Sequence, residues 1–112
     1  MEPKELLSFL GVLERLKCNT RHCWTSTGRH ETVAAHSWRL AVMALLLKEQ
    51  FPGADMDKVL RMCLIHDFGE AVTGDIPSFD KTQADEEAEV MAVSNMLSPL
   101  PQPLRGELTA LF

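Results

Sequence analysis

Residues 64–77, "LIHDFGEAVTGDIP", place His66, Asp67 and Glu70 within five positions of an otherwise largely apolar stretch. Acidic side chains are rarely buried unless they are paired or coordinate a metal ion. The segment therefore either turns its charges towards water or places them against a group that requires them.

Helical spacing of apolar residues surrounds this stretch on both sides. It predicts helices over 3–17, over 33–50 with Thr32 as N-cap, from just after Asp55 to about Gly74, over 82–97, and from about Pro103 onward. Residues 18–31, "CNTRHCWTSTGRHE", show neither the helical nor the strand spacing of apolar residues. This predicts a loop, and its length indicates a functional one. With no convincing strand, the pattern favours an all-α single domain over 1–112.

Apolar spacing also predicts which side chains face inward. In the third helix these are Val59, Leu60, Cys63, Leu64 and, with them, Asp67. In the second helix the expected core residues are Val42, Met43, Leu45, Leu46 and Leu47.

Composition excludes several classes of protein. The 112 residues are 46% hydrophobic with a formal net charge of -5, which disfavours non-specific binding to a nucleic-acid polymer but leaves room for a small phosphorylated substrate. No apolar run approaches the roughly 18 residues needed to span a membrane, and the N-terminus lacks signal-peptide order. Three cysteines without a CxxC pair predict free thiols, with Cys63 buried. We expect a cytoplasmic protein.

His36, near the start of the preceding helix, is the obvious partner for His66 and Asp67. Two imidazoles and a carboxylate form a plausible set of ligands for Mn, Fe, Co, Ni or Zn, in preference to Mg or Ca. Glu70 follows Asp67 by three positions, so it projects beside the same groove and could transfer a proton. Each residue alone has a plainer interpretation: a chance His-Asp pair, a hydrogen-bonded interface histidine, a solvated glutamate.

The joint pattern carries a resemblance. "AAHSWRLAVMAL" (34–45) followed by "CLIHDFGEAVTGDIP" (63–77) resembles the HD-domain metal-dependent phosphohydrolases, and within them the bacterial 5'-deoxynucleotidases and their HD-containing relatives. The resemblance covers about 13–77 and continues more weakly into the acidic fourth helix. It implies a helical bundle with His36, His66 and Asp67 as metal ligands. It further implies Glu70, together with Asp67, as catalytic carboxylates, and Asp75 as a substrate-site residue near the sugar.

The segment before the second helix offers further substrate-binding candidates. The resemblance implies an arginine that contacts the substrate phosphate, and the spacing to His36 favours Arg21 over Arg29, which could equally be a surface residue. A guanidinium suits phosphate because it donates two parallel hydrogen bonds. Trp24 either covers the sugar or base, or anchors the loop on the core.

Two features depart from the family pattern. Ala35 stands where family members commonly have a glutamate that would close a capping box with Thr32, so we expect a weakened helix start. The fourth metal ligand, an aspartate from a later helix, has no convincing equivalent, since Asp80 and Asp85 lie too close to the preceding turn. We therefore expect an incomplete metal shell.

The end of the chain gives a related expectation. The last helix stops at Phe112 after about two turns, which indicates a helical domain truncated at its C-terminus. Its stripe of Leu104, Leu108 and Leu111 would then be exposed, and we expect a homodimer that buries it.

The resemblance favours an enzyme that hydrolyses nucleoside 5'-monophosphates, chiefly deoxynucleotides, to nucleoside and phosphate. Cleavage of a phosphodiester instead of a monoester remains open. The alternative is a catalytically impaired nucleotide-binding or assembly module that retains the HD residues, which the absent fourth ligand favours.

Overall fold

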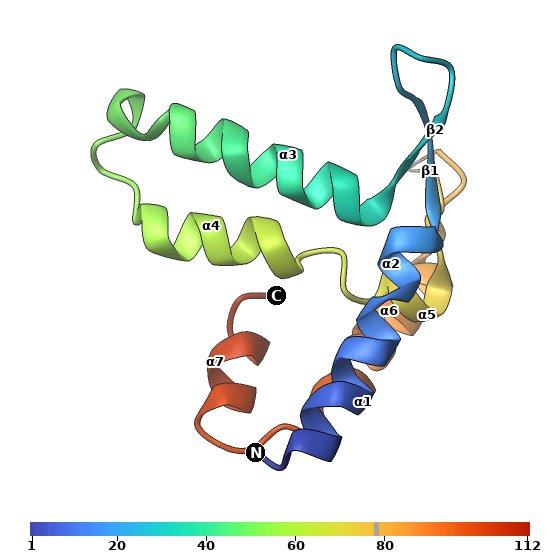
Figure 1. Cartoon of the computed structure of the whole chain (residues 1–112), viewed down its shortest axis with the longest axis vertical. Coiled ribbons are helices and arrows are strands. Elements are labelled where there is room, and N and C mark those ends of the chain that lie inside the picture. Colours follow the sequence, from blue (N-terminus) through green and yellow to red (C-terminus); the bar gives the residue numbers. More distant parts are fainter. Residues whose placement is uncertain (78) are drawn as a thin grey trace.

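The computed structural model describes residues 1–77 and 79–112, and these residues are mostly helical (Figure 1). The elements in chain order are α1 (Pro3–Leu13), α2 (Arg15–Cys18), β1 (Thr20–Trp24), β2 (His30–Thr32), α3 (Val33–Leu46), the 3-10 helix η1 (Lys48–Gln50), α4 (Met56–Ile65), α5 (Glu70–Thr73), α6 (Gln83–Leu97) and α7 (Leu104–Thr109). The helical prediction is confirmed in outline, although the first helix divides at Glu14 into α1 and α2. None of the described helices is long and apolar enough to cross a membrane.

The expectation of a loop without strands over 18–31 is wrong. The segment forms an antiparallel hairpin in which Thr20 pairs with Thr32, followed by an irregular register. Its turn is closed by the Thr25 amide donating to the Arg29 carbonyl at 2.6 Å. Gly28 in this turn has a φ of 83°, a left-handed conformation that favours glycine. The strands are too short and too polar to give the alternating signal on which a sequence prediction depends.

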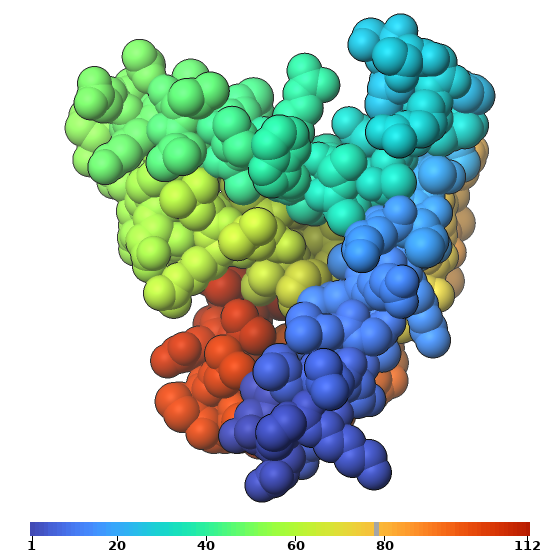
Figure 2. All heavy atoms as spheres, in the orientation of Figure 1, coloured from blue at the N-terminus to red at the C-terminus, as the bar shows by residue number. Residues whose placement is uncertain are grey.

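Helices α3 and α4 lie side by side as an antiparallel pair that projects from the rest of the molecule (Figure 1). The Thr32 hydroxyl caps α3 by accepting the Ala35 amide at 3.1 Å. Figure 2 shows the surface notched where this pair meets the hairpin and again where it meets α7. Helix α2 and strand β2 contact the start of α3. The predicted burial of part of its apolar run is wrong, because these side chains towards its end are exposed: Met43, Leu45, Leu46 and Leu47.

The third predicted helix does not continue to Gly74. Helix α4 ends at Ile65, and the chain passes through tighter turns before α5, with the Phe68 amide bonded to the Ile65 carbonyl and the Glu70 amide to the Asp67 carbonyl, both at 3.0 Å. Leu64 is exposed, so its predicted inward position is wrong, and Ile65, for which no position was predicted, is buried in its place. Cys63 is buried as expected. Residues 66–69 thus form a compact turn, the HD turn, between α4 and α5.

Helix α6 agrees with its predicted bounds. Thr82 and Asp85 form a capping box at its start, with the Thr82 amide donating to the Asp85 carboxylate at 2.9 Å. Gly69 approaches α6 so closely that a Cβ atom at this position would lie 3.2 Å from both the Glu89 carbonyl oxygen and the Val93 side chain. A glycine in the HD turn therefore lets the turn rest directly on α6.

The core joins segments that are distant in sequence. Leu16, Val33 and Ala71 are buried together, and Phe68 packs beside them. The Phe68 ring also lies 6.4 Å from that of Phe112, between centroids, so the end of the chain contacts the HD turn. The predicted exposure of the C-terminal stripe is wrong, since these side chains are partly buried: Leu104, Leu108 and Leu111.

Candidate metal centre

The α3–α4 pair positions three potential ligands at one end. His36 lies in the first turn of α3, and His66 and Asp67 follow the last residue of α4, so the antiparallel arrangement brings them together. One ligand atom from each of the three residues lies within 4.8 Å of the others. The His66 Nε2 and His36 Nε2 atoms are 3.0 and 3.7 Å from the Asp67 Oδ2 atom.

His66 is oriented by the helix that precedes it. Its Nδ1 donates to the Cys63 carbonyl at 2.9 Å, and because a carbonyl only accepts, this bond leaves Nε2 facing Asp67. The hydrogen bond to Asp67 raises the pKa of His66 despite its partial burial. A backbone partner behind a ligating imidazole is the usual way in which a protein fixes its tautomer.

The other two residues hold the protonation states that a metal requires. Burial, and then the positive charge of Arg21, lower the pKa of His36, so this imidazole is neutral at neutral pH. Burial alone would raise the pKa of Asp67, but the hydrogen bond and charge of His66 outweigh it and lower that pKa. A neutral imidazole and an ionised carboxylate are the states that bind metal ions. The donor set therefore fits a divalent transition metal ion.

Glu70 is buried beside this cluster, and its Oε2 atom has no hydrogen-bond partner among the described residues. Burial, followed by the neighbouring carboxyl groups of Asp75 and Asp67, raises its pKa to about 8. The Asn19 side chain donates to the Glu70 carbonyl at 2.8 Å and so ties α5 to the start of the hairpin. A buried carboxyl with an unsatisfied oxygen is suited to receive or deliver a proton.

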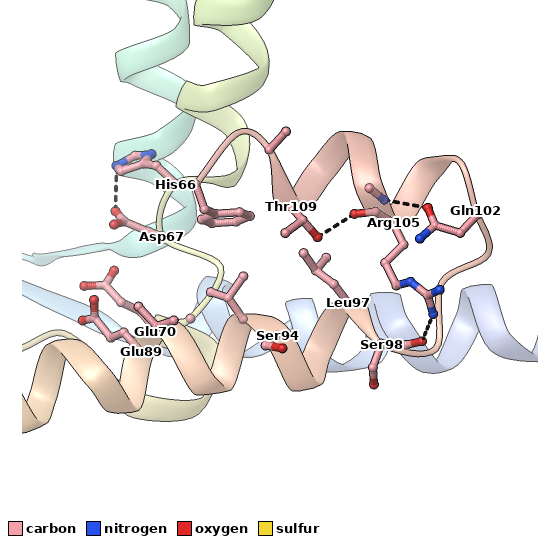
Figure 3. A pocket seen from close by; sticks show the side chains of 16 residues that line it. His66, Asp67, Glu70, Glu89, Ser94, Leu97, Ser98, Gln102, Arg105 and Thr109 are labelled. Atoms are coloured by element: carbon pink, nitrogen blue, oxygen red, sulfur yellow. Dashed lines mark hydrogen bonds and ion pairs between the residues drawn. The ribbon is translucent and has the colours of Figure 1, made fainter.

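A pocket of about 1090 Å³ opens next to the cluster (Figure 3). Its polar end is formed by His66, Asp67, Glu70 and Glu89, and Figure 3 shows the last two carboxylates side by side. Apolar side chains of α6 line the middle of the pocket, and α7 lines its far end. Arg105 of α7 donates a hydrogen bond to the Ser98 carbonyl at 3.0 Å. Two of the three metal-binding candidates, His66 and Asp67, thus face a space large enough for a small molecule.

The substrate-binding candidates are distributed over the hairpin and the segment after α5. Arg21 is half-buried and its Nη1 atom lies 2.7 Å from the Glu31 Oε1 atom. The Asp75 carboxylate accepts the backbone amide of His22 at 3.2 Å, which fixes it against β1.

Trp24 and Arg29 lie further along the hairpin. Trp24 is 65% exposed and stacks on His30, with ring centroids 3.7 Å apart, so its predicted alternative role as an anchor on the core is wrong. Arg29 is exposed in the turn at the tip of the hairpin, which projects beyond the start of α3 (Figure 1).

Sequence reasoning missed four residues that support the site: Asn19, His22, Glu31 and Glu89. Asn19 acts through one side-chain hydrogen bond to the Glu70 carbonyl, and His22 through contacts of its amide and its ring with Asp75, none of which a spacing rule reveals. Glu31 stands one position before the N-cap of α3, and the strand pairing that places it opposite Arg21 was not foreseen.

The described part of the chain offers three ligands and not four. Asp85 is exposed and engaged in the cap of α6, and Asp80 is exposed as well. Neither belongs to the cluster of His36, His66 and Asp67.

Comparison with known proteins places this geometry in a family. A family model described as HD domain matches residues 13–112. The 5'-deoxynucleotidase HDDC2 of Homo sapiens is 34% identical over 97% of this chain and 54% of its own length, and a 5'-deoxynucleotidase of Schizosaccharomyces pombe is 28% identical over 91% and 54%. The chain thus spans about half the length of the curated relatives it matches.

Two solved structures are similar to this chain in fold and sequence. A crystal structure described as a predicted metal-dependent phosphohydrolase from Magnetospirillum magnetotacticum superposes with a TM-score of 0.85 at 34% identity, covering 96% of this chain and 56% of that one. A conserved hypothetical protein from Pyrococcus furiosus gives a TM-score of 0.75 at 33% identity, covering 95% and 63%. With its His36, His66 and Asp67 side chains gathered at one end of the α3–α4 pair and its sequence matched from residue 13 to residue 112, the chain belongs to the HD domain family.

Proposed function

We propose that this chain is a metal-dependent phosphohydrolase that removes phosphate from deoxynucleoside 5'-monophosphates. The observation that carries the proposal is the convergence of the His36, His66 and Asp67 ligand atoms within 4.8 Å. This donor set favours Mn, Fe, Co, Ni or Zn over Mg. When bound, such an ion offsets the charge of the phosphate and makes water more acidic.

The chain's own residues supply the remaining chemistry. Glu70, with a pKa of about 8, holds a proton at neutral pH and can deliver it to the oxygen that leaves phosphorus. Arg21 binds the phosphate through its guanidinium, since the contact with Glu31 employs Nη1 and an arginine has five N–H donors. Asp75, held by His22, is placed to accept a hydrogen bond from a sugar hydroxyl. Trp24 offers an exposed face for the base, and Arg29 a cation at the hairpin tip.

The choice of substrate rests on the relatives. Those reported above are named 5'-deoxynucleotidases, which supports a deoxynucleoside monophosphate over a diester. The nucleotide pool on which such an enzyme would act fits the cytoplasmic location predicted from the sequence.

The experiment measures release of inorganic phosphate from deoxynucleoside and ribonucleoside 5'-monophosphates and from a phosphodiester, with each metal in turn. We expect release from the deoxynucleotides and its loss in His66→Ala. His36→Ala and Asp67→Ala should lower metal occupancy far more than Glu70→Ala, which should abolish turnover with the metal retained. No release from any substrate by folded, metal-loaded protein would refute the proposal.

The second candidate is a nucleotide-binding or assembly module without turnover. The observation in its favour is that the described residues supply three clustered ligands. Stoichiometric metal and measurable nucleotide binding without phosphate release would establish it in place of the enzyme.

Self-association belongs to the proposal. The C-terminal stripe is partly covered, but large apolar side chains on α3 are exposed, including Trp38, Leu45 and Leu46. A homodimer that buries this face is the arrangement we favour.

A further inference from the structure

The carboxylate of Glu31 lies between two residues of the candidate site. Its Oε1 atom is 2.7 Å from Arg21 Nη1 and 4.0 Å from His36 Nδ1. The Glu31 side chain is only 17% exposed, so water competes weakly for these contacts.

The two contacts come from how the hairpin joins α3. Thr20 pairs with Thr32 in the antiparallel hairpin, so the next residue of β1, Arg21, lies opposite the preceding residue of β2, Glu31. Glu31 is also five positions before His36, with Thr32 between them as the cap that turns the chain into the helix. One oxygen atom thus contacts a residue on β1 and another in the first turn of α3.

His36 is held between two carboxylates. Its Nδ1 faces Glu31, and its Nε2 lies 3.7 Å from Asp67 Oδ2. A carboxylate hydrogen-bonded behind a metal-ligating imidazole fixes the ring and strengthens the other nitrogen as a ligand, and its loss typically costs 10–100-fold in metal affinity. The 4.0 Å between Glu31 Oε1 and His36 Nδ1 is longer than a hydrogen bond, so Glu31 acts on the ring through its charge and the lower end of that range applies. His66 has a backbone carbonyl in this role, that of Cys63.

We propose that Glu31 is a positioning residue that holds both the phosphate-binding guanidinium of Arg21 and the metal-ligating imidazole of His36. The proposal rests on the proposed function, because it assigns those two roles to Arg21 and His36. Removal of the Glu31 charge then weakens binding of the metal and of phosphate together, although Glu31 touches neither.

The experiment uses Glu31→Gln, which keeps the shape of the side chain and removes its charge. Binding of Co²⁺ alone, and of inorganic phosphate to the Co²⁺-loaded protein, is measured by calorimetry on variants shown to be folded by circular dichroism. We expect the dissociation constant for Co²⁺ to rise about 10-fold, and that for phosphate to rise as well. Glu31→Asp, which restores the charge, should recover part of both losses.

Two further variants separate positioning from general stability. Arg21→Ala should weaken phosphate binding without raising the dissociation constant for Co²⁺, because it removes a positive charge near His36 and Asp67 and leaves Glu31 facing the His36 ring. Asp57→Asn removes an exposed ion pair with Arg61 on α4, 3.2 Å long, and should change neither constant.

The outcomes distinguish this proposal from the proposed function. If Glu31→Gln lowers the melting temperature but changes neither constant, or changes only one, Glu31 is a structural residue and the inference is wrong. If both constants rise in Glu31→Gln but the wild-type protein releases no phosphate from any nucleotide, the positioning role stands and the enzymatic proposal fails.

Discussion

Glu70 carries a proton at neutral pH in the metal-free protein, because burial and the adjacent carboxyl groups of Asp75 and Asp67 raise its pKa to about 8. The ordinary value is 4.5, so between about pH 4.5 and 8 the unfolded chain releases this proton while the folded chain retains it. The free energy of unfolding therefore falls as the pH rises through this window.

Glu70→Gln removes this dependence, since an amide does not ionise. In metal-free protein we expect the variant to match the wild type near pH 4 and to exceed its stability at pH 8 by about 1–2 kcal/mol, after allowance for screening by solvent. Thermal unfolding in the presence of a chelator measures this at both pH values. A constant difference between the two proteins across the range would show that Glu70 titrates normally.

Residue chemistry predicted which candidate metal ligands lie together, because histidine and aspartate are metal-ligating residue types wherever they occur in a chain. His36, His66 and Asp67 come together as expected. Glu31 was not predicted as a site residue, because a glutamate before a helix is common and has no special sequence context. Its contact with Arg21 arises only from a strand pairing between residues ten positions apart. Trp24 was ambiguous for a similar reason, since its contact with His30 depends on the hairpin.

Among the elements, α3 begins with half of a capping box. Thr32 accepts the Ala35 amide, but alanine offers no side chain to return the bond. Ala35→Glu completes the box, and we expect it to raise the free energy of unfolding by about 0.3–1.5 kcal/mol. Denaturant titration measures the gain. In the Thr32→Ala background the same substitution should give no comparable gain, and an equal gain there would argue against capping.

Gly69 determines how the HD turn rests on α6. A methyl group there would meet the Glu89 carbonyl and the Val93 side chain at 3.2 Å, and a backbone carbonyl yields little. Gly69→Ala should therefore lower the free energy of unfolding by about 1–3 kcal/mol.

Gly11→Ala is the matched control for that substitution. It lies within α1 with nothing within 4 Å of the new atom, so it should stabilise the protein by up to about 1 kcal/mol. Chemical denaturation of both variants gives the comparison, and similar effects at the two glycines would mean that the α5–α6 contact is not close packed.

Helix periodicity located the helical segments, because it reports which face of a helix meets an apolar surface. Periodicity did not locate the breaks at Glu14 and after Ile65, since the apolar pattern continues across both. The tighter turns after Ile65 bring Gly69 against α6, a contact between segments distant in sequence that no local signal contains. The same limit explains Leu45 and Leu46, whose helical spacing indicated a core that the described residues do not supply.

For the whole molecule, the exposed apolar face of α3 predicts association. We expect a dimer by light scattering, with Leu45→Glu/Leu46→Glu converting it to a monomer that remains helical. Leu7→Glu, at an equally exposed position on α1, should leave the dimer intact. A monomeric wild-type protein at micromolar concentration would remove the argument for a homodimer.

His36 and His66 stand at the open end of the α3–α4 pair, thirty positions apart in the chain (36 to 66). An ion held by both would close the intervening chain into a loop, and loop closure removes conformational freedom from every residue within it. Metal binding would therefore restrict residues far from the ligands as well as the ligands themselves. Amide hydrogen exchange along α3 and α4 would slow on metal binding, even at amides that never approach the ion.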